Sequence, residues 1–401
     1  MINYLKQMNN EDYRNEKKIL FIIFSSWIFF IFSYVFLGDL INKGSLVNGY
    51  KLGGDSEFYL SETDNLINGN SFKNLSRLGF YFVLAPFQYF DIHLAWFVVF
   101  QSIVTGIAGL CLYKITSAYF SKSSGLICLL LFLFYIPIQI RNYYILTDIL
   151  FIDLSIITTY FIYFYKKKYL PLIIICVLLL GLFRQNGILY LFSIFSALLF
   201  YLNYKKKYLY IFFYLCFCIV LILPVIEILN YLSANSNLVR SIAERGIIYG
   251  YSFDTKSVCF SKCHSVELIR VTKTSSLLDL FNFYQDNFIN LMKLFFYKVF
   301  WLLARFRPYY SDLHNLYILL YVIALYPAFL YGFVKRPKNN FAINVALFFI
   351  FFQIILFGIT FVDWSGRFSL YFIPFIMIFS SHGILTFLNF VSKKLLGKLN
   401  Y

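Results

Sequence analysis

Charged residues are scarce in this sequence, and acidic residues are the scarcer kind. Only 13% of the 401 residues are Asp, Glu, Lys or Arg, whereas 60% are hydrophobic and 22% are aromatic. The mean hydropathy is +0.71. A soluble domain of this length cannot bury so much apolar surface. The composition therefore excludes a soluble globular protein and predicts a multi-span α-helical membrane protein.

Motifs of soluble enzymes are also missing. The sequence has no G-x-x-x-x-G-K-[ST], no G-x-S-x-G and no H-E-x-x-H, which leaves ATP-driven transport and serine or zinc hydrolysis without support. The histidines are too scattered to predict a metal site: His93, His264, His314 and His382. Cys259 and Cys263 lie in a polar segment, where an oxidising compartment would allow a disulfide.

Acidic residues are outnumbered by basic ones, with 19 Asp and Glu against 35 Lys and Arg and a net charge of +16. The basic residues form no single patch, so we expect no nucleic-acid partner. They come in short clusters between apolar runs, such as 166–168, 205–207 and 335–338. Clusters of this kind are typical of cytoplasmic loops and of contact with anionic lipids.

The alternation of apolar runs and basic clusters predicts about ten spans with both termini in the cytoplasm. Residues 1–18 and 392–401 are expected to be cytoplasmic tails, and residues 19–391 the transmembrane domain. Lys17 and Lys18 precede an apolar run without a small-residue cleavage site, so we expect this run to be an anchor rather than a signal peptide. The predicted spans are 19–38, 92–114, 124–140, 149–165, 169–183, 187–204, 208–229, 313–334, 341–361 and 368–391.

Two outer segments interrupt this pattern. The first outer loop covers 39–91 and contains a short apolar piece, 79–90, that is expected to lie in the membrane interface. A polar segment at 230–286 is expected outside, and the apolar residues 288–304 are read as an interfacial or re-entrant helix. After residue 18, every acidic residue except Asp153 falls in a predicted outer loop or at an outer span end. This one-sided placement favours an active site on the outer face.

The first outer loop gathers carboxylates at high density, with four acids within residues 55–64. Carboxylates beside a membrane are costly to desolvate, so they usually face water, a metal or a substrate. In a helix, Asp55, Tyr59 and Glu62 would share one face, and Gly53-Gly54 would permit a sharp turn before it. The stretch is either a solvated loop with helix-capping acids or a site whose carboxylate acts as a general base or holds a divalent cation.

A second polar group runs from Arg141 to Asp148 in the next outer loop. Asp148 begins a predicted span, so a helix N-cap is the alternative to a functional role. Asp153 lies one turn deeper and should face the bundle interior, either as a functional group or as a buried hydrogen-bonding partner.

Arginines supply a third group. Arg184 and Arg367 lie at predicted outer span ends, against the charge bias. An arginine there has a carboxylate partner, binds an anion such as phosphate in bidentate fashion, or extends to the lipid headgroups. Together with Arg305 and Arg307, the set favours a phosphate site.

These segments together resemble membrane glycosyltransferases of the GT-C fold, the group of protein O-mannosyltransferases and aminoarabinose lipid A transferases. One departure is Ser56, where many relatives carry Glu; Glu57 is then a candidate for that role. The resemblance covers most of residues 19–391 and is of the bacterial surface-polysaccharide type. The matching segments are Asp55 to Tyr59 and Gly69, Ile145 to Asp148, Gly181 to Arg184, and Arg367-Phe368 to Pro374.

The resemblance implies transfer of a sugar from a polyprenyl-phosphate carrier to a lipid, glycan or protein acceptor on the outer (periplasmic) face of the inner membrane. Its catalytic carboxylates would be Asp55, Glu57 and Asp148, and its donor-phosphate ligands Arg184, Arg305 and Arg367. No cofactor is certain, although Asp55 and Asp148 would be the ligands of a divalent metal. The expected contacts with acceptor or sugar are Tyr59, Glu62, Arg77 and Arg141.

Two other functions stay open. A surface-polysaccharide polymerase would use the same lipid-linked sugars with a different acceptor. A lipid-linked oligosaccharide flippase belongs to another class, and transporters generally show internal repeats and helices broken at the membrane midplane. The sequence has no evident repeat, and its polar residues gather at one predicted face, which favours the transferase.

Overall fold

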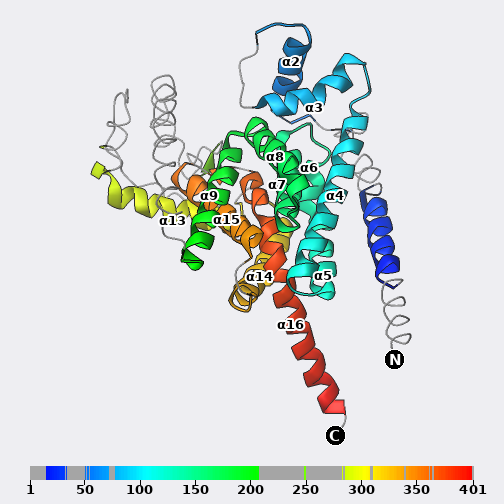
Figure 1. Cartoon of the computed structure of the whole chain (residues 1–401), viewed down its shortest axis with the longest axis vertical. Coiled ribbons are helices and arrows are strands. Elements are labelled where there is room, and N and C mark those ends of the chain that lie inside the picture. Colours follow the sequence, from blue (N-terminus) through cyan, green and yellow to red (C-terminus); the bar gives the residue numbers. More distant parts are fainter. Residues whose placement is uncertain are drawn as a thin grey trace. The chain divides into compact units, whose positions relative to one another are not determined.

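The computed structural model is almost entirely helical and confirms the all-α class (Figure 1). Two strands of two residues each, β1 (Ile248–Tyr249) and β2 (Val362–Asp363), pair in parallel. The structure describes residues 15–31, 33, 50, 52–53, 55–71, 77–206, 248–249, 282, 285–307, 310–337, 340–360, 362–363 and 365–399.

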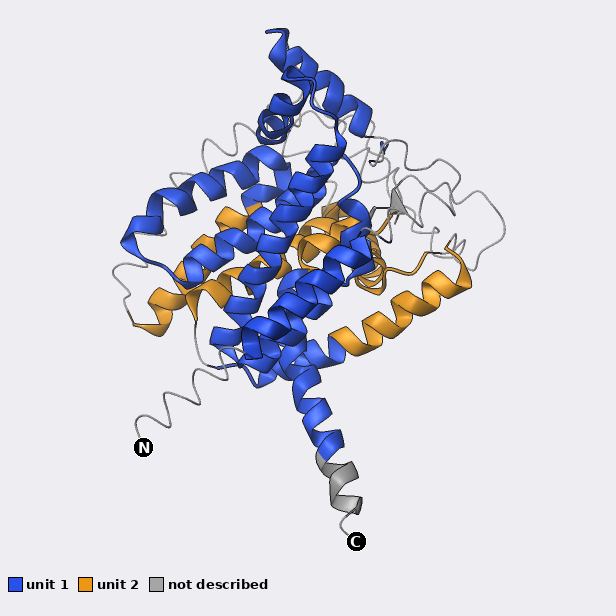
Figure 2. Ribbon diagram, turned by 90° about the vertical axis from the view of Figure 1, so that its right-hand side faces the viewer, with its two compact units in different colours: residues 1–188, 326–338, 374–401 blue, residues 189–325, 339–373 orange. Residues whose placement is uncertain are grey.

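The chain divides into two compact units, which Figure 2 colours separately. Unit 1 comprises residues 1–188, 326–338 and 374–401, and unit 2 comprises residues 189–325 and 339–373. Two of the passages between the units lie inside helices. One passage lies within α14 (Asp312–Val334), and another lies at the start of α16 (Ile373–Leu399).

Unit 1 is built around α4 (Ala95–Tyr119), which packs against both α5 (Lys122–Leu133) and α7 (Thr147–Tyr163). Helix α7 packs in turn against α8 (Leu170–Phe183), which the short turn η3 (Lys167–Tyr169) precedes. Gly125 allows α4 and α5 to approach, because a Cβ atom there would lie 1.9 Å from the Ser117 Oγ. Small residues serve close helix packing in membrane proteins for this reason.

The N-terminal helix, residues 15–31, joins unit 1 through Trp27. The indole ring lies against Gly106 of α4, and its Nε1 donates a hydrogen bond to the Gln139 Oε1 at 3.1 Å. Gln139 belongs to the six-residue helix α6 (Ile136–Arg141). A buried indole needs such a partner for its N–H group.

Two short helices, α2 (Ser56–Ile67) and α3 (Leu78–Tyr89), pack against each other at one end of unit 1 (Figure 1). Helix α2 ends at Asn68 and Gly69, where Gly69 adopts a φ of +70° that suits glycine. Helix α3 has 12 residues, which is too short to cross a bilayer. A short helix in place of a span at 79–90 agrees with the sequence-based prediction.

Unit 2 contains most of α9 (Ile188–Tyr204), α13 (Phe288–Ala304) and α15 (Phe341–Ile359), with α13 packed against α15. The η6 turn (Arg367–Tyr371) follows β2, and its Phe368 ring stacks on Phe357 of α15 at 4.4 Å. Lys298 of α13 is buried and donates from its Nζ to the Thr360 carbonyl oxygen at 2.6 Å, which satisfies the end of α15.

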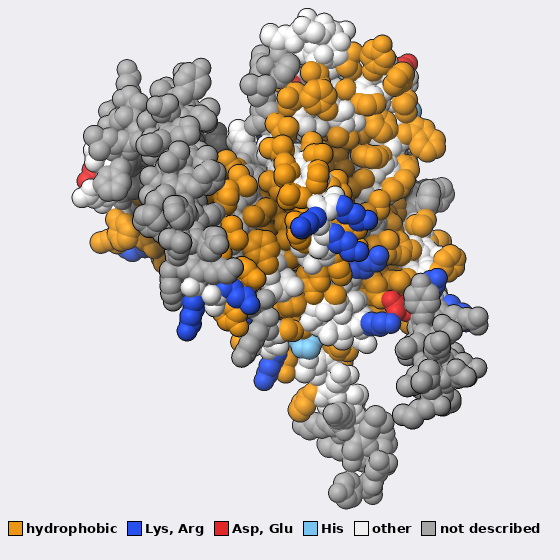
Figure 3. All heavy atoms as spheres, viewed as in Figure 1, with side chains coloured by type: hydrophobic (Ala, Val, Ile, Leu, Met, Phe, Trp, Pro, Cys, Tyr) orange, Lys and Arg blue, Asp and Glu red, His pale blue; other side chains and the backbone are white. Residues whose placement is uncertain are grey.

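Several helices are long and apolar enough to cross a membrane, and they indicate a membrane-embedded protein. Within the described residues there are five, and each coincides with a predicted span. Hydrophobic side chains cover much of the described surface on the face drawn in Figure 3, as a lipid environment requires. The five spans are Ala95–Tyr119, Gln185–Tyr204, Asp312–Val334, Phe341–Ile359 and Ile373–Ser392.

Other predicted spans are shorter or broken, so the total of about ten stays a prediction. The segment 124–140 is not one helix, because α5 ends at Leu133 and α6 begins at Ile136 with Pro137 in its first turn. Helices α7 and α8 have 17 and 14 residues, at or below the length of a typical span. The predicted span 208–229, most of the polar segment 230–286, and the pair Cys259 and Cys263 lie outside the described residues.

Candidate functional site

The N-terminal turn of α2 places Asp55. Ser56 closes this turn, because its backbone N–H donates to the Gly53 carbonyl at 2.8 Å and its Oγ accepts from the Gly53 N–H at 2.8 Å. Gly53 lies against the Tyr144 ring, in the loop that leads into α7. Asp55 is the N-cap residue of α2 and is partly exposed, so its carboxylate lies where the helix dipole favours negative charge.

Tyr59 lies one turn further along α2 and is only 1% exposed. Its ring packs against Phe80 of α3 with 5.2 Å between ring centroids. Its hydroxyl accepts a hydrogen bond from the Nη1 of Arg77, the residue before α3. The Arg77 guanidinium also lies over the ring, with its Cζ 4.9 Å from the centroid. Arg77 therefore joins α2 and α3 at Tyr59.

Thr147 and Asp148 form the first turn of α7 and are both fully buried. The Arg184 Nη1 lies 2.7 Å from the Asp148 Oδ1 and donates to the Thr147 Oγ1 at 2.8 Å. Arg184 is the C-cap residue of α8. An acid at a helix N-terminus and an arginine at a helix C-terminus each favour the local dipole, so the antiparallel α7 and α8 bring the pair together.

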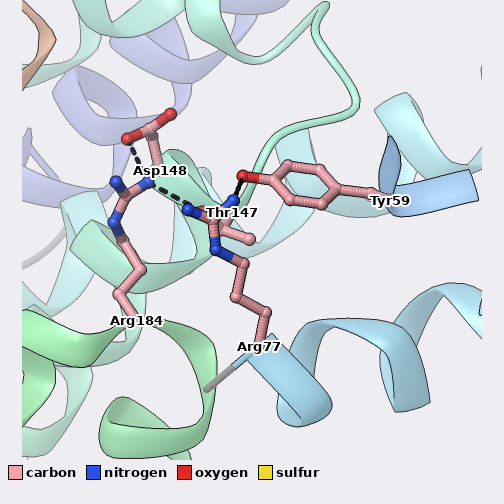
Figure 4. Close-up of polar contacts among 5 residues, drawn as sticks. All are labelled: Tyr59, Arg77, Thr147, Asp148 and Arg184. Atoms are coloured by element: carbon pink, nitrogen blue, oxygen red, sulfur yellow. Dashed lines mark hydrogen bonds and ion pairs between the residues drawn. The ribbon is translucent and has the colours of Figure 1, made fainter. Parts of the chain in front are cut away.

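Figure 4 shows Arg77 bonded to the Tyr59 hydroxyl, and Arg184 bonded to Thr147 and Asp148. Burial raises the pKa of Tyr59, the positive charges of Arg77 and Arg184 lower it, and the negative charges of Asp148 and Asp55 raise it again. These four charged residues are the ones that act on the pKa of this phenol. Two of them, Asp55 and Asp148, are carboxylates from separate outer-loop motifs.

The remaining predicted residues of unit 1 lie around this cluster in different environments. Glu57 is exposed on the first turn of α2. Glu62 is 3% exposed and accepts a hydrogen bond from the Asn65 Nδ2 at 3.4 Å. Arg141, at the end of α6, lies over the Tyr144 ring with its Cζ 5.6 Å from the centroid. Glu62 is the buried acid of α2, whereas Glu57 faces outward.

In unit 2, three arginines gather at the end of α13 and the start of η6. A Cβ atom placed on Gly366 would lie 3.6 Å from the Arg305 Nη2 and 3.8 Å from the Arg307 Nη2. Arg367 is the next residue in the chain. Gly366 has a φ of +68°, and Arg305 has a φ of +60°, which is uncommon for a residue with a side chain. The backbone therefore turns sharply at both places to bring these cations together.

Arg307 is 1% exposed and supports the end of α13. Its Nη1 donates to the carbonyl oxygens of Trp301 at 3.1 Å and Phe306 at 2.7 Å. Asn315 holds its backbone, because the Arg307 N–H donates to the Asn315 Oδ1 and the Asn315 Nδ2 donates to the Arg307 carbonyl. A cation at this position also offsets the negative end of the helix dipole.

Sequence reasoning placed Asp148 at the start of α7 with an N-cap as the alternative. The structure gives the N-cap position to Leu146 and pairs Asp148 with Arg184 instead. The sequence-based prediction did not include Thr147 as a partner of Arg184. The Thr147 hydroxyl, next to Asp148 in the sequence, could have indicated this contact. Within the described ranges, no three His, Cys, Asp or Glu side chains come close enough together to hold a metal ion.

Comparison with protein-family models, curated proteins and solved structures finds no match to this chain.

Proposed function

We propose that this protein is a membrane glycosyltransferase of the GT-C type that moves a sugar from a polyprenyl phosphate to an acceptor hydroxyl. The observation that carries the proposal is that Asp55 and Asp148 both act on the pKa of Tyr59, whose hydroxyl bonds to Arg77, while Arg184 pairs with Asp148. The two acids come from α2 and α7, far apart in the sequence. They are the two acidic positions that the motif resemblance singles out.

The two carboxylates are suited to different roles. Asp148 is fully buried and paired with Arg184, so an acceptor hydroxyl has no access to it. Asp55 is partly exposed at the edge of the cluster, where an acceptor hydroxyl has access to it. We therefore assign Asp55 as the general base and Asp148 as the group that orients Arg184.

The reaction then follows from these roles. The Asp55 carboxylate takes the proton of the acceptor hydroxyl while the hydroxyl oxygen bonds to the anomeric carbon of the sugar. The bond between that carbon and the phosphate oxygen breaks, and its electron pair leaves with the polyprenyl phosphate. Preorganised guanidinium groups stabilise the charge that develops on this phosphate. Arg184, which is held by Asp148 and Thr147, supplies such a group within unit 1.

A membrane location suits this chemistry. A polyprenyl-linked donor stays in the bilayer and must reach the enzyme from the side, so an embedded enzyme is required. The long apolar helices α4, α14 and α15 meet that requirement. We place the cluster on the outer face of the cytoplasmic membrane because the basic loops are predicted to lie inside.

The test is release of free polyprenyl phosphate by purified protein in detergent, given a panel of lipid-linked sugars and acceptors. Asp55→Asn should lower the rate on the order of a hundredfold or more, since it removes the base but keeps the size and polarity of the side chain. Asp64→Asn is the matched control, because Asp64 is an exposed acid of the same helix that bonds to Gln88.

One result would overturn the proposal, and another would change the residue assigned as the base. Wild-type protein that releases no polyprenyl phosphate, yet moves lipid-linked sugar across reconstituted vesicles, would be a flippase. A fully active Asp55→Asn variant would remove the assigned base and shift the assignment to Glu57 or Asp148.

A further inference from the structure

A chain of buried polar side chains crosses unit 1 beneath the Tyr59 cluster. It runs from Trp27 of the N-terminal helix through Gln139 and Asn142 to Thr105 of α4 and Asp153 of α7. All five side chains are at most 5% exposed. Because no water reaches these groups, each donor must meet an acceptor within the chain.

The direction of these hydrogen bonds is fixed from the tryptophan end. An indole N–H can only donate, so the Gln139 Oε1 must face Trp27, and the Gln139 Nε2 turns to the Phe132 carbonyl. The Asn142 Nδ2 then donates to the same Gln139 Oε1 at 3.2 Å. Asn142 must therefore present its Oδ1 to Thr105, at 3.0 Å.

Thr105 is left with more acceptors than protons. Its Oγ1 lies 2.7 Å from the Asp153 Oδ2, 3.0 Å from the Asn142 Oδ1 and 3.1 Å from the Gln101 carbonyl oxygen. A hydroxyl has a single proton, and the Asn142 and Gln101 oxygens cannot donate. The shortest contact, to Asp153, therefore needs a proton of its own.

We propose that Asp153 is a neutral carboxylic acid that donates its proton to Thr105 and thereby positions the loop that leads to Thr147 and Asp148. With this proton in place, Thr105 gives its own hydrogen to the Asn142 Oδ1 and the Gln101 carbonyl as a three-centre bond. Each contact of the Thr105 hydroxyl then has a proton, without an ionised carboxylate in the helix bundle, whose burial would be costly.

The charges around Asp153 fit a neutral acid. Asp153 forms no ion pair with any described residue, unlike Asp148 five residues earlier. The Cys111 thiol of α4, which senses the charge of Asp153, offers no positive charge. On the α8 side, Arg184 is already joined to Asp148.

The loop between α6 and α7 is what this network holds. Asn142 begins the loop, and the Gln101 Nε2 donates to the carbonyl oxygens of Asn142 and Tyr144, each at 3.1 Å. Gln101 and Thr105 lie one turn apart on α4, so both hydrogen-bond to the loop from the same face of that helix. Three residues after Tyr144, the chain reaches Thr147, where α7 begins.

Infrared difference spectroscopy on the whole protein tests the protonation directly. A protonated carboxyl has a carbonyl stretch at higher frequency than a carboxylate, and this band moves in D2O. At neutral pH, wild-type protein should show the band, Asp153→Asn should lack it, and Thr105→Val should shift it. Absence of the band, its persistence in Asp153→Asn, or an unmoved band in Thr105→Val would overturn the proposal. Asp64→Asn is the control and should leave the band unchanged.

Hydrogen exchange tests the positioning. Asp153→Asn keeps an N–H donor for Thr105, whereas Asp153→Leu does not. Amides of residues 142–146 should exchange about tenfold faster in Asp153→Leu than in wild type, and Asp153→Asn should restore the wild-type rate. Equal exchange rates in all three proteins would overturn the positioning role of Asp153. So would an Asp153→Asn variant that exchanges as fast as Asp153→Leu. The catalytic meaning of this loop rests on the proposed function, but both measurements are independent of activity, so the two can fail separately.

Discussion

The Arg184 guanidinium and the Asp148 carboxylate form an ion pair of 2.7 Å in which the two side chains are only 10% and 1% exposed. The pair links the end of α8 to the start of α7 and also engages Thr147. It holds one of the three predicted catalytic carboxylates in a fixed position. It also ties down an arginine that the sequence alone would assign to a phosphate.

Removing one partner of this pair should lower the free energy of unfolding much more than removing both partners. Arg184→Gln leaves a buried carboxylate without its cation and should lower the free energy of unfolding by roughly 3–5 kcal/mol. The double variant Arg184→Gln with Asp148→Asn should recover a large part of that loss. Thermal unfolding of the four proteins in detergent measures the coupling.

The pair of Glu16 and Lys122 provides the matched comparison. Its Lys122 side chain is 66% exposed, so the same double-mutant cycle should give a coupling of at most about 1 kcal/mol. A coupling between Asp148 and Arg184 as small as that of the exposed pair would mean that their charges do not hold α7 and α8 together.

The sequence was a good guide to long apolar helices and to the kinds of partner that polar groups need. Helices α4, α9, α14, α15 and α16 coincide with apolar runs because a single helix must satisfy its own backbone in lipid. An arginine at a span end was expected to have a carboxylate partner or an anionic ligand, and Arg184 has the carboxylate. Asp153 was predicted to be either a functional group or a buried hydrogen-bonding partner, and the structure places it in a hydrogen-bonded network.

Other features depend on packing that hydropathy does not record. The break between α5 and α6 falls inside a continuous apolar run and allows Gln139 to meet Trp27. The choice of Asp148 as the partner of Arg184 depends on the register of α7 against α8. The meeting of Arg305 and Arg307 at Gly366 depends on two backbone turns with positive φ. None of these follows from the periodicity of a single segment.

The pair of Glu16 and Lys122 should also make stability depend on pH at the acid end. The hydrogen bond from Lys122 and a second one from Tyr113 lower the pKa of Glu16 below its ordinary value of 4.5. A lowered carboxyl pKa contributes stability that is present above the unfolded-state value and is lost as pH falls through the folded-state value. The difference in melting temperature between wild type and Glu16→Gln should therefore shrink as the pH falls below 4.5. Glu57→Gln, at an exposed position, should show no such trend.

The topology can be tested with single cysteines in a protein whose native cysteines are replaced. The lysine clusters predict that position 167 faces the cytoplasm and that position 57 on α2 faces outward. A membrane-impermeant maleimide added to intact cells should label a cysteine at Glu57, which is exposed, and miss one at Lys167 until the cells are opened. The reverse pattern would place the Tyr59 cluster inside and remove the outer-face donor from the proposal.

Substitution of Arg367, one of the arginines at Gly366, distinguishes a role in phosphate stabilisation from a role in packing alone. Lysine at position 367 keeps the positive charge but loses the planar fork that binds two phosphate oxygens. If Arg367 acts on the leaving phosphate as its bond breaks, Arg367→Lys should lower kcat more than it raises KM. A lost hydrogen bond to a charged group costs about 1–3 kcal/mol, which corresponds to roughly tenfold to a hundredfold in rate. Arg336→Lys is the matched control, since Arg336 lies over the Phe333 ring in the other unit, with 4.1 Å from its Cζ to the centroid. An Arg367→Lys enzyme with the wild-type rate would leave the transferase in place and take the phosphate role away from Arg367 alone.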